Sequence, residues 1–190
     1  MRLSLSVAVI FLLLSACAGA AGPVVSSGDR YVQATGAGED YRLGSGDKIR
    51  ISVYNEPTLS GEFSVTADGL LSLPLIGDVK VAGKSAGEVS ATIQEMLGNG
   101  YLKDPKIGLE IVTYRPFFIL GEVKTPGQFP YATGMTALNA IALAQGFSPR
   151  AQKSVVYIRQ AGRTDEIAYK LAPDLRVLPG DTIRIGERYF

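Results

Sequence analysis

Two pairs of carboxylates are the groups in this 190-residue sequence that could support acid–base chemistry. Folding could bring Glu56 and Asp68 together, and Asp165 and Glu166 are neighbours along the chain. Glycoside hydrolysis needs two carboxylates held at a set separation across a cleft, and neither spacing indicates one. The sequence contains no His, so a Ser-His-Asp triad is excluded and the commonest general base is missing. We interpret both pairs as solvated surface charges and do not expect an enzyme.

Cys17 is the single cysteine of the chain, so it can form neither an internal disulfide nor a thiolate metal site. It follows Leu14-Ser15-Ala16 and an apolar stretch over 3–14 that is too short to cross a bilayer of about 30 Å. This arrangement resembles the bacterial lipobox, in which the cysteine thiol takes a diacylglycerol. An ordinary signal peptide is the alternative. We predict a lipoprotein signal peptide over 1–16 and lipidation at Cys17.

The segment after the predicted cleavage site, 17–39, is rich in Ala, Gly and Ser and has little apolar pattern. Such a composition predicts a flexible tether between the lipid and the folded part. Ala18 follows Cys17, whereas Asp at that place marks inner-membrane retention in the lipoprotein pathway. The resemblance to lipoproteins therefore implies a lipid-anchored protein of the outer membrane that faces the periplasm.

Gly83-Lys84-Ser85 matches the end of a phosphate-binding P-loop, but the full motif needs a glycine five residues earlier. Asp78 stands there, and its charge would repel phosphate. The chain has 19 basic and 18 acidic residues, which gives no net field to attract nucleic acid. We therefore expect no cofactor, no metal and no nucleic acid, and interpret 83–85 as an ordinary turn and helix cap.

Short apolar runs, several of which alternate with polar residues, predict strands at 48–53, 107–111, 117–121, 155–158 and 182–185. Asp68-Gly69 lies between apolar residues of 63–73, which predicts a β-hairpin there. Ser85 and Glu88 fit a capping box and so predict the start of a helix that Gly98 ends.

A second helix is expected to begin after Thr136 and to end at Gly146, with one apolar face formed by Leu138, Ile141 and Ala142. The run Tyr114–Pro116 then marks a boundary between two small units, 40–113 and 114–190. Each unit mixes strands with one helix, which is an α+β pattern.

Four residues flank the strand that opens the second unit: Tyr114, Arg115, Glu122 and Lys124. They are candidates for lining a sugar path or a contact between subunits, and a solvated rim near a boundary is the alternative. A faint internal similarity also joins 43–51 and 178–185, because each contains a Gly-Asp turn that leads into a strand with Ile residues. Such turns are common, so no repeat is inferred from them alone.

Taken in order, these segments resemble the outer-membrane polysaccharide export lipoproteins of capsule and exopolysaccharide systems. In the first unit the resemblance rests on Tyr41–Ile49, Val53–Pro57, Asp68-Gly69, Leu73–Gly77, Val81–Gly83 and Tyr101–Pro105. In the second it rests on Gly121–Gly127 and Leu138–Gly146. The resemblance implies a polysaccharide export domain followed by a β-grasp domain of the SLBB type, in a short form without the C-terminal membrane-spanning helix of longer members.

The family resemblance also implies partners. Such proteins form a homo-oligomeric ring through which polysaccharide passes, and the ring meets an inner-membrane polysaccharide co-polymerase of the chain-length-determinant type. A separate outer-membrane barrel is left open as a further partner. We therefore predict a component of a capsule or exopolysaccharide export apparatus, and the alternative is an envelope lipoprotein that binds soluble glycan and forms no conduit.

Overall fold

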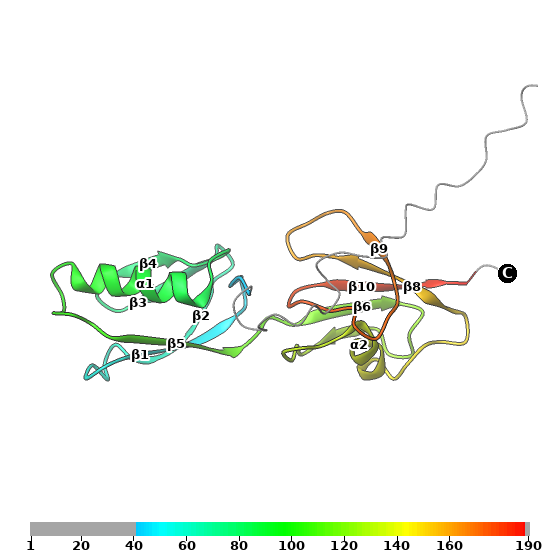
Figure 1. The fold of residues 1–190 in the computed structure, drawn as a ribbon, viewed down its shortest axis with the longest axis horizontal. Coiled ribbons are helices and arrows are strands. Elements are labelled where there is room, and N and C mark those ends of the chain that lie inside the picture. The colour runs from blue at the N-terminus through cyan, green and yellow to red at the C-terminus, as the bar shows by residue number, and fades with distance from the viewer. Residues whose placement is uncertain (1–40, 189–190) are drawn as a thin grey trace, which may run out of the picture.

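The computed structural model of the chain describes residues 41–188, which form two units placed end to end (Figure 1). Cys17 and the predicted signal peptide and tether lie outside the described residues. The first unit contains β1 (Lys48–Val53), β2 (Gly61–Ser64), β3 (Leu70–Leu73), β4 (Gly77–Lys80), α1 (Ala86–Gly98) and β5 (Ile107–Thr113). The second contains β6 (Phe117–Gly121), β7 (Gly127–Phe129), α2 (Ala137–Leu143), β8 (Ala151–Arg159), β9 (Ile167–Lys170) and β10 (Thr182–Glu187). The predicted α+β class is confirmed.

The first unit is built on an antiparallel sheet in the order β2-β1-β5. Every second residue of β1 is buried, so one face of this strand enters the core while the other meets solvent. Helix α1 packs against β5, and its buried residues are Val89, Ile93 and Leu97. These side chains share one hydrophobic core with Ile49 and Ile51 of β1.

The predicted hairpin over 63–73 is wrong in its pairing. Strand β2 pairs with β1, whereas β3 pairs with β4 in a separate two-stranded sheet. Asp68-Gly69 does form a turn, in which the Gly69 N–H donates to the Thr66 carbonyl at 2.9 Å. The hairpin turn itself lies at 74–76, where Leu75 adopts a positive φ of 68°. A local turn signal cannot show which neighbouring strand offers the better edge, and here β1 is that edge for β2.

The second unit is a five-stranded sheet in the order β7-β6-β10-β8-β9, with α2 packed on one face. Strands β6 and β10 run parallel, and the other neighbours are antiparallel. Phe117 and Ile119 of β6 and Ile183 of β10 are fully buried beneath the helix. This core shares none of its buried members with the core of the first unit.

The predicted apolar face of the second helix is wrong for two of its three residues. Ile141 is buried, but Leu138 and Ala142 are exposed, and the buried neighbours of Ile141 are Ala137 and Ala140. Small alanine side chains let the helix axis approach the sheet closely, which larger side chains on that face would prevent. The helix ends at Leu143, three residues before Gly146.

Candidate functional site at the junction of the two units

Asp47 lies at the junction of the two units, and its side chain is fully buried. Its Oδ2 accepts hydrogen bonds from the Tyr41 hydroxyl at 2.6 Å and from the Gly44 N–H at 2.7 Å. Its Oδ1 accepts the Arg115 backbone N–H at 2.8 Å. A buried carboxylate without partners lowers the stability of the fold by an amount on the order of several kcal/mol, so Asp47 needs these hydrogen bonds.

Arg115 supplies the countercharge from the linker between the units. Its Nη1 lies 3.2 Å from Asp47 Oδ2, and its side chain is 20% exposed. On its other side, Nε donates to the Pro179 carbonyl at 3.1 Å. One guanidinium therefore bonds to a turn of the first unit and to a turn of the second, which fixes the two units relative to one another.

Two glycines make room for this guanidinium. A Cβ on Gly44 would lie 2.0 Å from Arg115 Nη1, and a Cβ on Gly180 would lie 2.7 Å from Arg115 Nε. Gly180 also has a positive φ of 82°, which glycine adopts without steric cost. The side chain of Arg115 thus runs between two turns that both lack a Cβ at the point of contact.

The internal similarity between the two Gly-Asp turns has a geometric counterpart. Asp181 is fully buried like Asp47, and its Oδ2 accepts the Leu178 N–H at 2.8 Å, just as Asp47 accepts the N–H three residues before it. In both turns the aspartate N–H also donates back to that residue's carbonyl, at 3.1 Å. The two units therefore present equivalent turns, and Arg115 lies between them.

A row of tyrosines continues the junction. The rings of Tyr41 and Tyr114 meet edge to face with centroids 4.9 Å apart, and those of Tyr114 and Tyr131 with centroids 5.4 Å apart. Tyr131 belongs to the second unit, so Tyr114 bridges the two units by contacts that favour a defined geometry. Together with the pair of Asp47 and Arg115, these contacts make the junction a structural clamp, which we call the clasp: Tyr41, Asp47, Tyr114, Arg115 and Pro179.

The phenol of Tyr41 is expected to make stability fall at alkaline pH. Burial, and then the hydrogen bond to Asp47, raise the pKa of Tyr41 above its ordinary value of 10.0. The neutral phenol is thus favoured in the folded state, so its stabilisation is complete below about pH 10 and is lost as the pH rises toward the raised folded value. Tyr41→Phe should cost about 1–3 kcal/mol at neutral pH, since a bond to a charged acceptor is removed.

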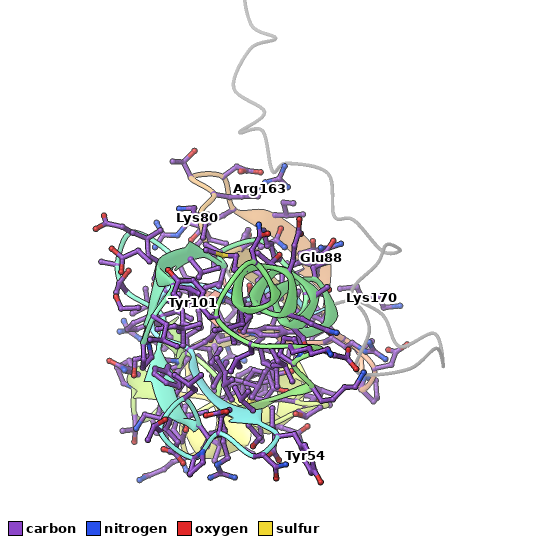
Figure 2. The ribbon with its side chains drawn as sticks, turned by 90° about the vertical axis from the view of Figure 1, so that its left-hand side faces the viewer. Tyr54, Lys80, Glu88, Tyr101, Arg163 and Lys170 are labelled. Carbon is purple, nitrogen blue, oxygen red and sulfur yellow. The ribbon has the colours of Figure 1, made fainter. Side chains whose placement is uncertain are left out.

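Denaturant unfolding at neutral pH and above pH 10 checks this expectation. The wild-type protein should lose more stability than Tyr41→Phe across that interval. Tyr54→Phe is the matched control, because Tyr54 is 73% exposed and lies on the side of the first unit away from Glu88 and α1 (Figure 2). Equal alkaline losses in wild type and Tyr41→Phe would show that this phenol is not linked to folding.

The four candidates around the second unit's first strand separate in space. Tyr114 and Arg115 belong to the clasp, whereas Glu122 and Lys124 follow the opposite end of β6. Glu122 accepts a hydrogen bond from the Ser148 hydroxyl and lies 3.8 Å from Arg150, and Lys124 is exposed. They do not form one site. Asp47 was not singled out for a role from the sequence, and the similarity of the two Gly-Asp turns was the signal that could have found it.

The two carboxylate pairs considered for acid–base chemistry do not line a shared cleft. Asp165 and Glu166 lie beside arginines, and Glu56 and Asp68 lie in turns. The Glu166 carboxylate accepts hydrogen bonds from Arg184 Nε at 2.9 Å and from Arg184 Nη2 at 2.7 Å. Asp165 lies 3.9 Å from Arg163. Glu56 lies in the turn after β1, where its carbonyl accepts from the Ser60 hydroxyl. Asp68 lies in the turn before β3. Among residues 41–188 no group of three or more His, Cys, Asp or Glu side chains could hold a metal.

The carboxylate of Glu88 caps the N-terminus of α1, next to Gly83-Lys84-Ser85. Glu88 N–H donates to the Ser85 hydroxyl at 3.2 Å, and the Ser85 N–H donates to the Glu88 carboxylate at 2.6 Å, so the predicted capping box is confirmed. The bond from the Ser85 backbone lowers the pKa of Glu88. Arg42 also contacts this carboxylate. The positive end of the helix is therefore already neutralised by Glu88.

Comparison with known families identifies both units. Residues 35–112 match the family described as polysaccharide biosynthesis/export protein, and residues 116–167 match the SLBB domain. The chain therefore contains a polysaccharide export domain followed by an SLBB domain, as the sequence resemblance implied. In the described part of the chain, no helix has the length and apolar character needed to cross a membrane.

Three curated proteins are similar in sequence to this chain. The exopolysaccharide production protein ExoF of Rhizobium meliloti (strain 1021) is 38% identical over 57% of this chain and 28% of its own length. The polysialic acid transport protein KpsD of Escherichia coli is 26% identical over 80% of this chain and 29% of its own. The EPS I polysaccharide export outer membrane protein EpsA of Ralstonia nicotianae is 32% identical over 78% of this chain and 48% of its own. The chain thus spans between about a quarter and a half of these relatives.

Proposed function

We propose that this chain is a component of an envelope apparatus that exports capsular polysaccharide or exopolysaccharide. The observation that carries the proposal is the direct succession of a polysaccharide export domain and an SLBB domain in one chain. The names of the relatives, which refer to exopolysaccharide production, polysialic acid transport and polysaccharide export, point to the same process. We place the division between the two domains at 113 and 114, just before the arginine of the clasp.

The proposed mechanism is passage and not chemistry. Copies of the chain form a ring, and the polymer moves through its lumen toward the outer membrane. The clasp supports this idea, because it holds the export and SLBB domains in a fixed orientation and so gives every copy in a ring the same shape. An inner-membrane co-polymerase delivers the polymer to the ring, and a separate outer-membrane protein is the further partner to seek.

Secretion and oligomeric state test this proposal together. Deleting the gene should abolish or strongly reduce polymer in the medium, and expression of the wild-type chain should restore it. Native mass measurement of the lipoprotein in detergent should show a closed oligomer. A monomer, together with unchanged secretion after deletion, would overturn the proposal. Saturable binding of a glycan by that monomer would instead favour the soluble-glycan-binding alternative.

We further propose that the diacylglycerol on Cys17 holds the ring at the outer membrane. Cys17→Ser should abolish incorporation of labelled fatty acid and should move the protein to the soluble periplasmic fraction or leave it unprocessed. Ala18→Ser, one residue further on, is the matched control and should remain lipidated and membrane-bound. If Cys17→Ser stayed in the outer membrane with export intact, another attachment would be responsible.

A further inference from the structure

The SLBB domain exposes apolar side chains on the free face of its sheet. Phe118 is 41% exposed and Leu120 is 43% exposed on β6, where they alternate with the buried Phe117 and Ile119. Because α2 covers the buried pair, the exposed pair projects from the opposite side of the sheet. Three of the four strand pairs of this sheet are antiparallel, and the solvated face of such sheets normally carries polar residues, so an exposed apolar pair on it marks a candidate contact surface.

The outward side of α2 is apolar as well. Leu138 is 38% exposed and Leu143 is 46% exposed, and both turn away from the sheet that α2 covers. Beside them is an open depression of about 470 Å³, which is lined by Ala132, Thr133, Gly134, Met135, Asn139, Ala142 and Leu143. One domain therefore has protruding apolar side chains on one outer face and a shallow apolar depression on the other.

The helix face can lose its water without stranding a charge. Residues 125–149, which include α2 and the depression, contain no Asp, Glu, Lys or Arg. On the sheet side, Arg184 stacks over Tyr157 at 4.1 Å and is held by three hydrogen bonds to Glu166, which balances its charge. Arg159, which is exposed in the same cross-strand row as Thr182 and Phe118, belongs to the polar rim of this face. Depletion of unbalanced charge is typical of the centre of a protein interface, since a buried lone ion is costly.

We propose that these two faces bind each other in neighbouring copies of the chain. The sheet face (Phe118, Leu120, Tyr157 and Arg184) of one copy covers the helix face (Met135, Leu138, Ala142 and Leu143) of the next. Two different patches on opposite sides of one domain make a head-to-tail contact, which closes into a ring when the rotation allows. The inference rests on the proposed ring and names the surfaces that build it.

The exposed apolar residues form only the centre of such a contact. A stable interface buries about 800 Å² on each partner, which is more than four side chains supply. The rim must therefore come from the polar residues around both faces and from the export domains alongside. The central residues should nevertheless dominate the affinity, because buried aromatic and aliphatic anchors carry most of the binding energy.

Cysteine crosslinking in polymer-free, purified lipoprotein tests the pairing of faces. A chain with both Leu120→Cys and Leu138→Cys, treated with a short bismaleimide, should give a ladder of covalent oligomers. Each single variant alone should give no crosslinked product, because Leu120 of one copy meets Leu138 of the next and not itself. The wild-type chain, whose single cysteine is Cys17, controls for that thiol.

Each other result of the crosslinking has a defined meaning. Dimers from the Leu120→Cys chain alone would show that sheet faces pair with sheet faces and would overturn the head-to-tail contact. No ladder from the double variant, although the wild-type chain is an oligomer in native mass measurement, would overturn this interface and leave the ring intact. A wild-type monomer would instead remove the proposed ring.

Charge insertion gives a second, independent readout. Leu120→Glu and Leu138→Glu, each tested separately, should weaken oligomerisation at least tenfold while circular dichroism shows an unchanged fold. Leu75→Glu is the control, because Leu75 is 56% exposed in the turn between β3 and β4 of the other domain. Oligomers of normal stability from both interface variants would contradict the proposal. An intact ring of Leu120→Glu that no longer binds glycan would also contradict it, because the sheet face would then contact glycan and not a second copy.

Discussion

Replacing Asp47 by Ala is expected to lower the free energy of unfolding by about 3–5 kcal/mol, the range measured when one partner of a buried ion pair is removed. The carboxylate is fully buried and accepts four hydrogen bonds, two of them from Arg115 and one from Tyr41. Its loss leaves the guanidinium of Arg115 20% exposed and without its countercharge. Asp47→Asn keeps the shape and some acceptor capacity, so it should cost less than Asp47→Ala.

Chemical denaturation, with fluorescence of the tyrosine row as the probe, measures this effect. Asp165→Ala is the matched control, because it removes a carboxylate whose side chain is 60% exposed and only 3.9 Å from its cation, and it should cost at most about 1 kcal/mol. Limited proteolysis should also cut the Asp47→Ala chain near the linker faster than the wild type. Equal costs for the two substitutions would mean that the clasp adds nothing to the cohesion of the domains.

Gly121→Ala is expected to destabilise the SLBB domain by about 2–5 kcal/mol. Gly121 has a φ of 83°, and a left-handed conformation costs a residue with a Cβ about 1–2 kcal/mol. The added Cβ would also lie 2.1 Å from the Ile185 carbonyl oxygen of β10. Overpacking of this kind costs about 1–3 kcal/mol more, because backbone atoms must move. Because Gly121 is paired with Ile185 in the parallel strands β6 and β10, its backbone cannot easily move away from the Ile185 carbonyl.

Gly134→Ala separates the two contributions. Gly134 has a φ of 80°, but a Cβ there would meet nothing within 4 Å, so only the conformational cost of about 1–2 kcal/mol should remain. Thermal unfolding of the three chains under one buffer condition gives the comparison. If both variants had the same melting temperature, the contact between Gly121 and β10 would have to be looser than the structure shows.

Local chemistry was predictable from the sequence, whereas the long-range choices were not. The capping box of Ser85 and Glu88 depends on residues three positions apart, and it formed as predicted. The bond between Asp47 and the Arg115 backbone joins residues 68 positions apart. No periodicity reports such a pairing, because it depends on how two separately folded units meet.

The two errors of the fold prediction have the same origin. The turn signal at Asp68-Gly69 predicts a hairpin there, but the pairing of β2 with β1 decides the topology. The sequence predicts Leu138, Ile141 and Ala142 as the apolar face of α2, but the sheet packs against Ala137 and Ala140 beside Ile141. Leu138 is then left outside, and it becomes a residue of the helix face that we assign to the contact between copies.

The uncharged run over 125–149 also sets how the helix face responds to its surroundings. No carboxylate, amine or guanidinium lies in it, and the chain has no imidazole, so between about pH 5 and pH 9 nothing in this run titrates. Added salt likewise has no charge there to screen. The export domain differs, since exposed ion pairs such as Arg50 with Glu62 weaken with both acid and salt. In the proposed contact, any response to acid or salt should therefore come from the sheet face, where Arg184 pairs with Glu166, and not from the helix face.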